Sequence, residues 1–332
     1  MDRKWIEALP KMDLHCHLDG SIHSQRIRDY LASIGEALPE DFDRWIAVSE
    51  DCPSLTEYLR CFDLPLRWLQ TEEGLEQAVV DLLWDAKVEN TRYLEIRFAP
   101  TLHLEGGLTY GRVFQALARG KARGEAETGV CCRLIVCAMR HHTREQNLAM
   151  LEAAKEFFPQ LVCAADLAGD ENAFPTTCHL DFFHRAAQLG IPFTIHSGET
   201  GNRENIRAAL ELGACRLGHG IAMAEDKALQ ERCRAAGVGI ELCPTSNFQT
   251  KAARGWEEYP LRRYLEMGLK ACLNTDNRTV SCTDLNREYL RAMEEGGCSR
   301  AEILTLLENA CDISFAPEEV KAAFRAELAA CR

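Results

Sequence analysis

Short apolar runs alternate along this chain with longer stretches whose apolar residues follow a helical period. Apolar runs of this length, bounded by polar residues and glycines, are typical of buried strands. Eight strands are predicted, at residues 11–17, 93–100, 130–139, 161–169, 192–199, 216–221, 238–244 and 270–276. The intervening stretches predict amphipathic helices, for example at residues 75–88, 180–189 and 226–236.

Regular alternation of strand and helix predicts parallel strands joined by crossover helices. Eight units in roughly 270 residues match the number and size of a (β/α)8 barrel of the TIM type. A doubly wound open sheet is the alternative, but no Gly-x-Gly-x-x-Gly motif follows the first strand. No linker or repeat divides the chain, so we expect one domain over residues 1–332.

Composition narrows the possible partners and location of the protein. A chain of 332 residues, 46% hydrophobic and 27% charged, can bury a large core. The formal net charge of −13 argues against a nucleic acid as partner. The sequence shows neither a signal-peptide pattern nor an apolar run long enough to cross a membrane. The sixteen cysteines are therefore expected to be reduced thiols in a cytoplasmic protein.

Two histidines lie one residue apart in the first predicted strand, within the segment DLHCHLDG at residues 13–20. Alternate side chains of a strand share a face, so His15 and His17 can bind one divalent cation. Further polar residues end the fifth, sixth and eighth predicted strands: His196 and Glu199, His219, and Asp276. In a barrel these strand ends form one rim, where active sites lie.

Together these residues predict a metal site. The imidazoles of three histidines and one carboxylate form a mixed nitrogen and oxygen ligand set: His15, His17, His196 and Asp276. Such a set suits Zn²⁺ first, with manganese, iron or cobalt possible, and leaves a position for water. A bound cation brings the pKa of water towards about 7, which supplies hydroxide at neutral pH. With His219 and Glu199 as acid–base groups beside it, the site predicts metal-assisted hydrolysis.

Each residue also has a structural interpretation. A lone strand histidine is more often a hydrogen-bonded core residue than a ligand, and Asp276 could cap a helix. Co-location at the ends of four strands favours the metal site, whereas Cys243 is expected to be a core residue. His141 and His142 either border the site or lie at the surface. The remaining histidines are expected at the surface: His23, His103, His179 and His184.

Five segments resemble the adenosine deaminase family of metal-dependent amidohydrolases. They are MDLHCHLDGS, DLAGDE, HSGE, LGHG and LNTD, in the family's order, and the resemblance covers residues 12–277. It implies hydrolytic deamination of adenosine, and of 2′-deoxyadenosine, to an inosine product and ammonia. It also implies one Zn²⁺ per chain, and a helical lid inserted at residues 21–90 between strands one and two.

The resemblance carries catalytic roles to matching positions. The four residues named above match the family's metal ligands. Glu199 matches the residue that protonates the purine at N1, for which its carboxyl must first be neutral. His219 matches the group that orients the attacking water and stabilises the charge that develops as hydroxide attacks C6. Catalysis is therefore expected to rest on Glu199, His219 and Asp276.

Substrate-binding roles follow in the same way. Gly169 matches a backbone donor to purine N3, where a side chain would block approach. Asp19 matches the residue that binds the ribose 5′-hydroxyl, and His17 is expected to contact the substrate as well. Four residues resemble the apolar wall that faces the purine, although a stripe at this helical spacing is ordinarily core: Leu55, Tyr58, Leu59 and Phe62.

One position departs from the family pattern. The family has two consecutive acids after the eighth strand, whereas this chain has Asp276-Asn277. The second acid is expected to donate a hydrogen bond to purine N7, and the amide of Asn277 can donate without being protonated. The departure leaves another 6-aminopurine, such as adenine or a 5′-modified adenosine, as the alternative substrate.

Other classes fit less well. Adenine deaminases tend to have a glutamate where Asp19 stands, and an AMP deaminase would need a basic phosphate site, which no Lys/Arg cluster beside the motifs provides. The motifs of cytidine-type zinc deaminases are absent, as is the strand-end lysine of phosphotriesterase-like hydrolases. A catalytically silent purine-binding barrel is the non-enzyme alternative, but it is expected to have lost a metal ligand or Glu199.

Overall fold

The computed structural model describes residues 2–49, 51–52 and 55–331, with only the backbone of residues 55 and 56. Its strands follow the predicted order. They are β1 (Lys11–His17), β2 (Thr91–Phe98), β3 (Cys131–Met139), β4 (Val162–Ala168), β5 (Thr194–Ser197), β6 (Arg216–His219), β7 (Gly239–Leu242) and β8 (Lys270–Leu273). All eight predicted strands are present. Six of the eight are shorter than predicted, because the predicted ranges also include residues of the neighbouring loops.

The strands close into a barrel. Neighbouring strands are parallel and form two four-stranded halves, β1-β2-β3-β4 and β5-β6-β7-β8. Single bridges join the halves at both edges, one between Cys16 and Asp276 and one between Ala165 and Phe193. The predicted (β/α)8 barrel is therefore confirmed, and the doubly wound open sheet is excluded because it would leave two unpaired edges.

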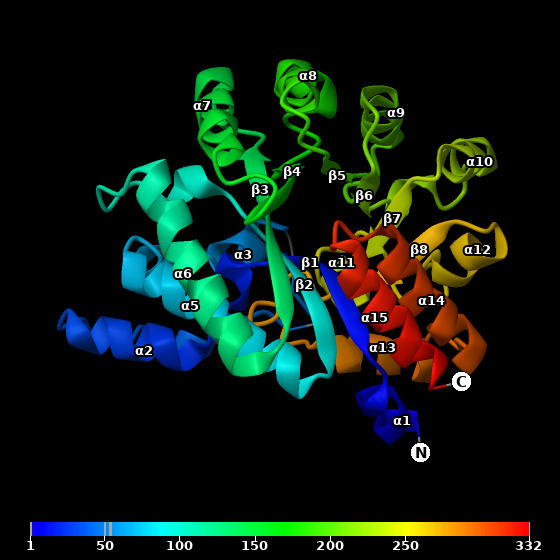
Figure 1. The fold of residues 1–332 in the computed structure, drawn as a ribbon, viewed down its shortest axis with the longest axis horizontal. Helices are drawn as coiled ribbons and strands as arrows, with labels where there is room; N and C mark the ends of the chain where they lie inside the picture. The colour runs from blue at the N-terminus through cyan, green and yellow to red at the C-terminus, as the bar shows by residue number, and fades with distance from the viewer. Residues whose placement is uncertain (1, 50, 53–54, 332) are drawn as a thin grey trace.

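Helices surround the strands (Figure 1). The α-helices are α1 (Asp2–Ala8), α2 (Ser24–Ser33), α3 (Leu55–Arg60), α4 (Asp63–Trp68), α5 (Glu72–Val88), α6 (Tyr110–Thr128), α7 (Arg144–Lys155), α8 (Leu180–Gln188), α9 (Arg203–Leu212), α10 (Lys227–Ala236), α11 (Pro244–Gln249), α12 (Leu261–Glu266), α13 (Leu285–Glu294), α14 (Arg300–Ile313) and α15 (Glu318–Ala329). Five 3-10 helices complete the fold: η1 (Asp19–Ser21), η2 (Phe42–Trp45), η3 (Pro100–His103), η4 (Thr176–His179) and η5 (Ile221–Met223). Among the described residues, no helix combines the length and apolar character needed to cross a membrane.

The segment between β1 and β2 is helical and has two parts. Its last helix, α5, packs against β2 and α6 and so belongs to the ring around the barrel (Figure 1). Thr71 caps this helix, because its hydroxyl accepts a hydrogen bond from the backbone N–H of Gly74. The shorter helices α2, α3 and α4 precede it, and α4 packs against α2 and η1. Only this earlier part lies near the carboxyl end of β1.

One prediction about the histidines is wrong. His103 was expected at the surface, but its side chain is fully buried. It ends η3, which turns back after β2, and its ring stacks on Phe98 with 5.9 Å between the centroids. Burial lowers the pKa of His103 to about 4, so the ring is neutral and packs as an aromatic residue. Of the other three, His184 is exposed, while His23 and His179 are partly buried.

Candidate active site

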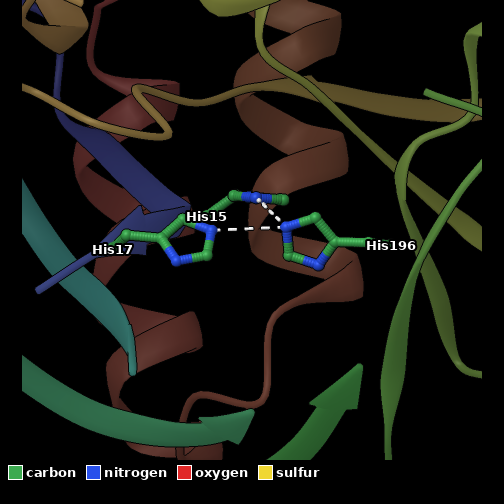
Figure 2. Close-up of side chains that lie close together, drawn as sticks. All are labelled: His15, His17 and His196. Carbon is green, nitrogen blue, oxygen red and sulfur yellow. Dashed lines mark hydrogen bonds between the residues drawn. The ribbon is translucent and has the colours of Figure 1, made fainter. Parts of the chain in front are cut away.

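Three imidazoles converge at the carboxyl ends of two strands. His15 and His17 leave β1 on the same face, as the strand period requires, and His196 leaves β5 from the other half of the barrel (Figure 2). Nε2 of His196 lies 3.1 Å from Nε2 of His15 and 3.3 Å from Nε2 of His17. The neighbouring Gly218 makes room for this cluster, because a Cβ there would lie 3.0 Å from Cε1 of His15.

Asp276 adds a carboxylate to the three rings. Its backbone pairs with β1, since its N–H donates to the carbonyl of His15 and its carbonyl accepts from the N–H of His17. This pairing puts Oδ1 of Asp276 3.6 Å from Nε2 of His15 and 3.4 Å from Nε2 of His17. Asp276 has a φ of 60°, which non-glycine residues rarely adopt and which is typical of functional sites.

The four side-chain atoms have the separations that a metal ion requires. Around a cation with bonds of about 2.1 Å, neighbouring ligand atoms lie about 3.0–3.6 Å apart for bond angles of about 90–120°. The observed distances of 3.1, 3.3, 3.4 and 3.6 Å agree with this range. The three histidines, with Asp276 beside His15 and His17, therefore fit one divalent cation.

The protonation of two rings supports this fit. Nδ1 of His15 lies 2.8 Å from Oε2 of Glu241, and Nδ1 of His196 lies 2.8 Å from Oδ2 of Asp166. A ring nitrogen this close to a carboxylate oxygen carries the proton between them. A ring that carries its single proton on Nδ1 presents the lone pair of Nε2, and both Nε2 atoms face the same point, as metal coordination demands.

His219 differs from these rings in its tautomer. Nδ2 of Asn247 lies 3.0 Å from its Nδ1, and Oδ1 of Asn247 accepts a hydrogen bond from the hydroxyl of Tyr259. An amide NH2 group only donates, so Nδ1 of His219 accepts and Nε2 carries the proton. Burial lowers the pKa of His219 to about 4, which keeps the ring neutral. His219 is therefore a hydrogen-bond donor at the site rather than a metal ligand.

Glu199 lies in the loop after β5, and Glu171 holds this loop. The carboxylate of Glu171 accepts hydrogen bonds from the backbone N–H groups of Gly198, at 2.8 Å, and Thr200, at 2.7 Å, on either side of Glu199. Oε2 of Glu199 lies 3.7 Å from Nε2 of His219. Burial raises the pKa of Glu199 to about 7, so its carboxyl can hold a proton near neutral pH.

A cavity of about 360 Å³ opens over these groups, a size typical of small-molecule sites. It is lined by eight predicted site residues on the barrel: His17, Asp19, Gly169, His196, Glu199, His219, Asp276 and Asn277. His15 lies beneath them and is fully buried. A larger groove of about 880 Å³ lies between α1 and α13, and the residues that line it include none of this set.

The predicted substrate-binding residues on the barrel differ in their surroundings. Asp19 is 7% exposed, its Oδ1 has no hydrogen-bond partner among the described residues, and burial raises its pKa to about 6. Gly169 has a φ of 108°, which only glycine adopts readily. Asn277 donates hydrogen bonds to the hydroxyl of Tyr58, at 2.9 Å, and to Oδ1 of Asp276, at 2.8 Å. Both of its N–H groups thus face the protein, and donation to a ligand requires one of them to change partner.

The expected apolar wall is partly described. Tyr58 and Leu59 on α3 and Phe62 after it line the cavity, whereas the side chain of Leu55 lies outside the described residues. Leu59 is 47% exposed, so it stands at the mouth of the cavity rather than in the core. Tyr58 is buried, and its hydroxyl lies 2.8 Å from Oγ of Ser281, so its contacts are polar as well as apolar.

Three further sequence expectations have clear outcomes. His141 lines the cavity and also a side pocket of about 210 Å³ that includes His142, so of the two only His141 borders the site. Cys243 is fully buried, and burial raises the pKa of its thiol well above the usual value. It is therefore a core residue, as predicted.

Sequence analysis did not assign roles to the residues behind the histidines. Asp166, Glu241 and Asn247 orient His196, His15 and His219, and all three are fully buried. A signal was present in the strands, because the single acids at 166 and 241 interrupt apolar runs. Acids in a barrel strand are buried only when they have partners, which marks them as part of a network.

Comparisons with known proteins agree with this geometry. A sequence model of a family described as adenosine deaminase matches residues 10–331. An adenosine deaminase of Clostridium acetobutylicum is 39% identical over 324 residues, which cover 96% of this chain and 97% of that protein. The solved adenine deaminase of Arthrobacter aurescens is 25% identical, with a TM-score of 0.89 and coverage of 97% and 98% of the two chains. A zinc-bound amidohydrolase of Burkholderia ambifaria shares the fold, with a TM-score of 0.90 at 22% identity and coverage of 99% and 92%.

Proposed function

The chain belongs to the adenosine deaminase family, and on this premise we propose that it hydrolyses adenosine, and 2′-deoxyadenosine, to an inosine product and ammonia. One observation carries this proposal. Three histidines and Asp276 converge on one point in a cavity that also contains a carboxyl able to stay neutral, Glu199, and a neutral histidine donor, His219. Deamination of a 6-aminopurine needs both kinds of group beside a nucleophile.

The cation in this proposal is Zn²⁺, held by His15, His17, His196 and Asp276. A ligand set of three imidazoles and one carboxylate suits zinc, and an amidohydrolase with the same fold binds it. When bound, the cation lowers the pKa of water and so supplies a nucleophile at neutral pH.

The protein groups carry the proton transfers and the recognition. Protonated Glu199 donates to purine N1, which removes electron density from C6 and makes it open to attack. Nε2–H of His219 donates a hydrogen bond to the oxygen that adds to C6, where negative charge develops. The backbone N–H of Gly169 donates to N3, Asp19 binds the ribose 5′-hydroxyl, and His17 contacts the substrate as well. The proton of the added hydroxyl passes to the 6-amino group, the C6–N bond breaks and ammonia leaves, so that the oxygen stays on C6 as a carbonyl and the proton from Glu199 stays on N1.

A panel of substrates tests the proposal. Purified protein loaded with Zn²⁺ is assayed for deamination of adenosine, 2′-deoxyadenosine, adenine, AMP and 5′-methylthioadenosine, each with and without a chelator. We expect fast conversion of the first two that the chelator abolishes. Preference for adenine, the substrate named for the similar Arthrobacter aurescens enzyme, would move the substrate assignment. No deamination of any compound by protein with verified metal would overturn the proposed function.

Replacing Asp19 by alanine should weaken recognition of the ribose. A hydrogen bond to a charged group contributes about 1.5–3 kcal/mol, so kcat/KM for adenosine should fall by about 10- to 100-fold. The same variant should act on 5′-deoxyadenosine as the wild type does, because that substrate lacks the hydroxyl. Steady-state kinetics with both substrates measure this difference, and equal losses with the two would contradict the role of Asp19.

Two variants at position 277 test recognition of N7. Asn277→Ala removes both N–H donors, whereas Asn277→Asp keeps one O–H donor when the carboxyl is protonated. We expect Asn277→Ala to lower kcat/KM by about tenfold or more and Asn277→Asp to lower it much less. With 7-deazaadenosine, which has no N7 acceptor, the two variants should differ little. Equal losses of the two variants with adenosine would exclude the N7 role.

We also propose that the α3–α4 part of the segment at residues 21–90 acts as a lid, since Leu59 and Phe62 line the cavity mouth. A cytoplasmic location is proposed as well. The sixteen cysteines support it, because no disulfide joins any of them in the described part of the chain, and reduced thiols persist in reducing compartments.

A further inference from the structure

Beneath the histidines, one buried arginine contacts two acids inside the barrel. Arg97 on β2 donates hydrogen bonds from Nη1 to Oδ2 of Asp166 and from Nη2 to Oε2 of Glu241, each at 2.8 Å. Nη2 also donates to the carbonyl of Leu14, at 2.7 Å. Arg97, Asp166 and Glu241 are all fully buried. A guanidinium presents its donors in a rigid planar fork, so these contacts fix the positions of both carboxylates.

The oxygens that Arg97 contacts are the same ones that face the metal-site histidines. Oε2 of Glu241 lies 2.8 Å from Nδ1 of His15, and Oδ2 of Asp166 lies 2.8 Å from Nδ1 of His196. Each oxygen therefore lies between one imidazole and one nitrogen of the guanidinium. Movement of Arg97 would move both carboxylates, and with them the acceptors that set the tautomer of both rings.

Arg97 also connects strands that have no backbone pairing with its own. β2 pairs with β1 and β3, whereas Asp166 lies on β4 and Glu241 on β7. His15 and His196 likewise come from different halves of the barrel. The relative position of the two rings thus depends on side chains that cross the interior, and Arg97 is the residue that touches the carboxylate behind each.

Charge balance supports the same role. Two buried carboxylates beside each other repel strongly unless a cation is held between them. In the folded protein Arg97 supplies that cation for both. Removing it would leave Oδ2 of Asp166 without its guanidinium and would leave Glu241 paired with Arg216 only through its other oxygen, Oε1, so both oxygens that face the imidazoles would lose their cation.

We propose that Arg97 is a positioning residue for the metal centre, which holds His15 and His196 with Nδ1 protonated and both Nε2 atoms facing the cation. This inference rests on the metal site of the proposed function but not on the identity of its substrate. It assigns to one interior arginine the alignment of ligands from both halves of the barrel.

Arg216 on β6 provides a matched control. It is as buried as Arg97, and its Nε donates to Glu241 through the other oxygen, Oε1, at 2.6 Å. Its other contacts include an ion pair with Glu95, a hydrogen bond to the carbonyl of Ile313 and the ring of Phe315, over which its guanidinium lies. Arg216→Met thus removes a buried arginine from the same network without removing a contact to the oxygens that face the imidazoles.

The test compares Arg97→Met, Arg97→Lys and Arg216→Met. For metal-free protein of each, the Zn²⁺ dissociation constant is measured by competition with a chromophoric chelator, and folding by circular dichroism. Loss of a group that orients metal ligands typically weakens binding by about 10- to 100-fold, and we expect this for Arg97→Met. Arg216→Met should lose stability but bind Zn²⁺ nearly as the wild type does. Arg97→Lys, which keeps the charge but loses the fork, should lie between the two.

Histidine ring spectra give a second readout that a merely structural role would not move. In protein labelled with ¹⁵N-histidine, His15 and His196 should show the Nδ1–H tautomer in the wild type and in Arg216→Met, and lose it in Arg97→Met. Wild-type zinc affinity in Arg97→Met, or equal weakening in both methionine variants with unchanged tautomers, would overturn the proposal. Should Arg97→Met not fold, Arg97→Lys decides by the same criteria. None of these readouts uses substrate, so they separate this inference from the deaminase assignment.

Discussion

Replacing His196 by alanine is expected to abolish deamination, with a loss of kcat of at least about 10³-fold, because metal-activated water is the nucleophile. The variant removes the only proposed histidine ligand from the second half of the barrel, whose Nε2 lies 3.1 Å from Nε2 of His15 and 3.3 Å from Nε2 of His17. Zinc content, measured by elemental analysis after dialysis, should fall well below one ion per chain. A chelator should have the same effect on the wild type, and added Zn²⁺ should reverse it.

His184→Ala is the matched control for this prediction. His184 lies on α8 with its side chain exposed, away from the cavity. This variant should keep one zinc ion per chain and wild-type activity. Full activity of His196→Ala after exhaustive chelation would contradict the assignment of the metal site.

Replacing Glu199 by glutamine should lower kcat by about 10²- to 10⁴-fold, the range attributed to a positioned general acid. Glutamine has nearly the same shape but cannot transfer a proton to N1. Because Glu199 is not among the proposed ligands, zinc content should stay at the wild-type value and KM should change little. Steady-state kinetics and elemental analysis of the same preparation measure both quantities.

Glu204→Gln controls for the loss of a negative charge near this loop. Glu204 is exposed in the first turn of α9, five positions further along the chain. It should be indistinguishable from the wild type in kcat. If Glu199→Gln lost zinc together with activity, its role would be structural rather than that of a proton donor.

Much of the architecture follows from local pattern. Strands in a parallel barrel are buried on both faces, so they form continuous apolar runs that stand out from the helices between them. The first strand was predicted with its observed bounds, Lys11–His17. The strand period of two predicted His15 and His17 on one face. Because the carboxyl ends of barrel strands form one rim, His196 and Asp276 were predicted beside them. Apolar runs and strand period depend on neighbouring residues, and the common rim depends on the fold class, so all of them can be inferred from a sequence.

Predictions failed or stopped where contacts join distant parts of the chain. His103 lies in the segment that follows β2, where the local sequence predicts a loop. Its side chain is buried because η3 turns back and stacks the ring on Phe98. Tyr58, Leu59 and Phe62, predicted as part of an apolar wall, line the cavity. The contacts of the Tyr58 hydroxyl with Ser281 and Asn277 were not predicted. Hydrogen-bond partners more than two hundred positions apart leave no periodic signal.

Residue pattern and motifs were enough to predict the barrel, the order of its strands, the candidate metal ligands and the family of the protein. Which nitrogen of each ring carries the proton became clear only from the packed side chains. Glu241 and Asp166 direct the lone pairs of His15 and His196 to one point, and Asn247 makes His219 a donor instead. The physical reason is that an imidazole has two nearly equivalent tautomers, and only the acceptor or donor packed against it selects one.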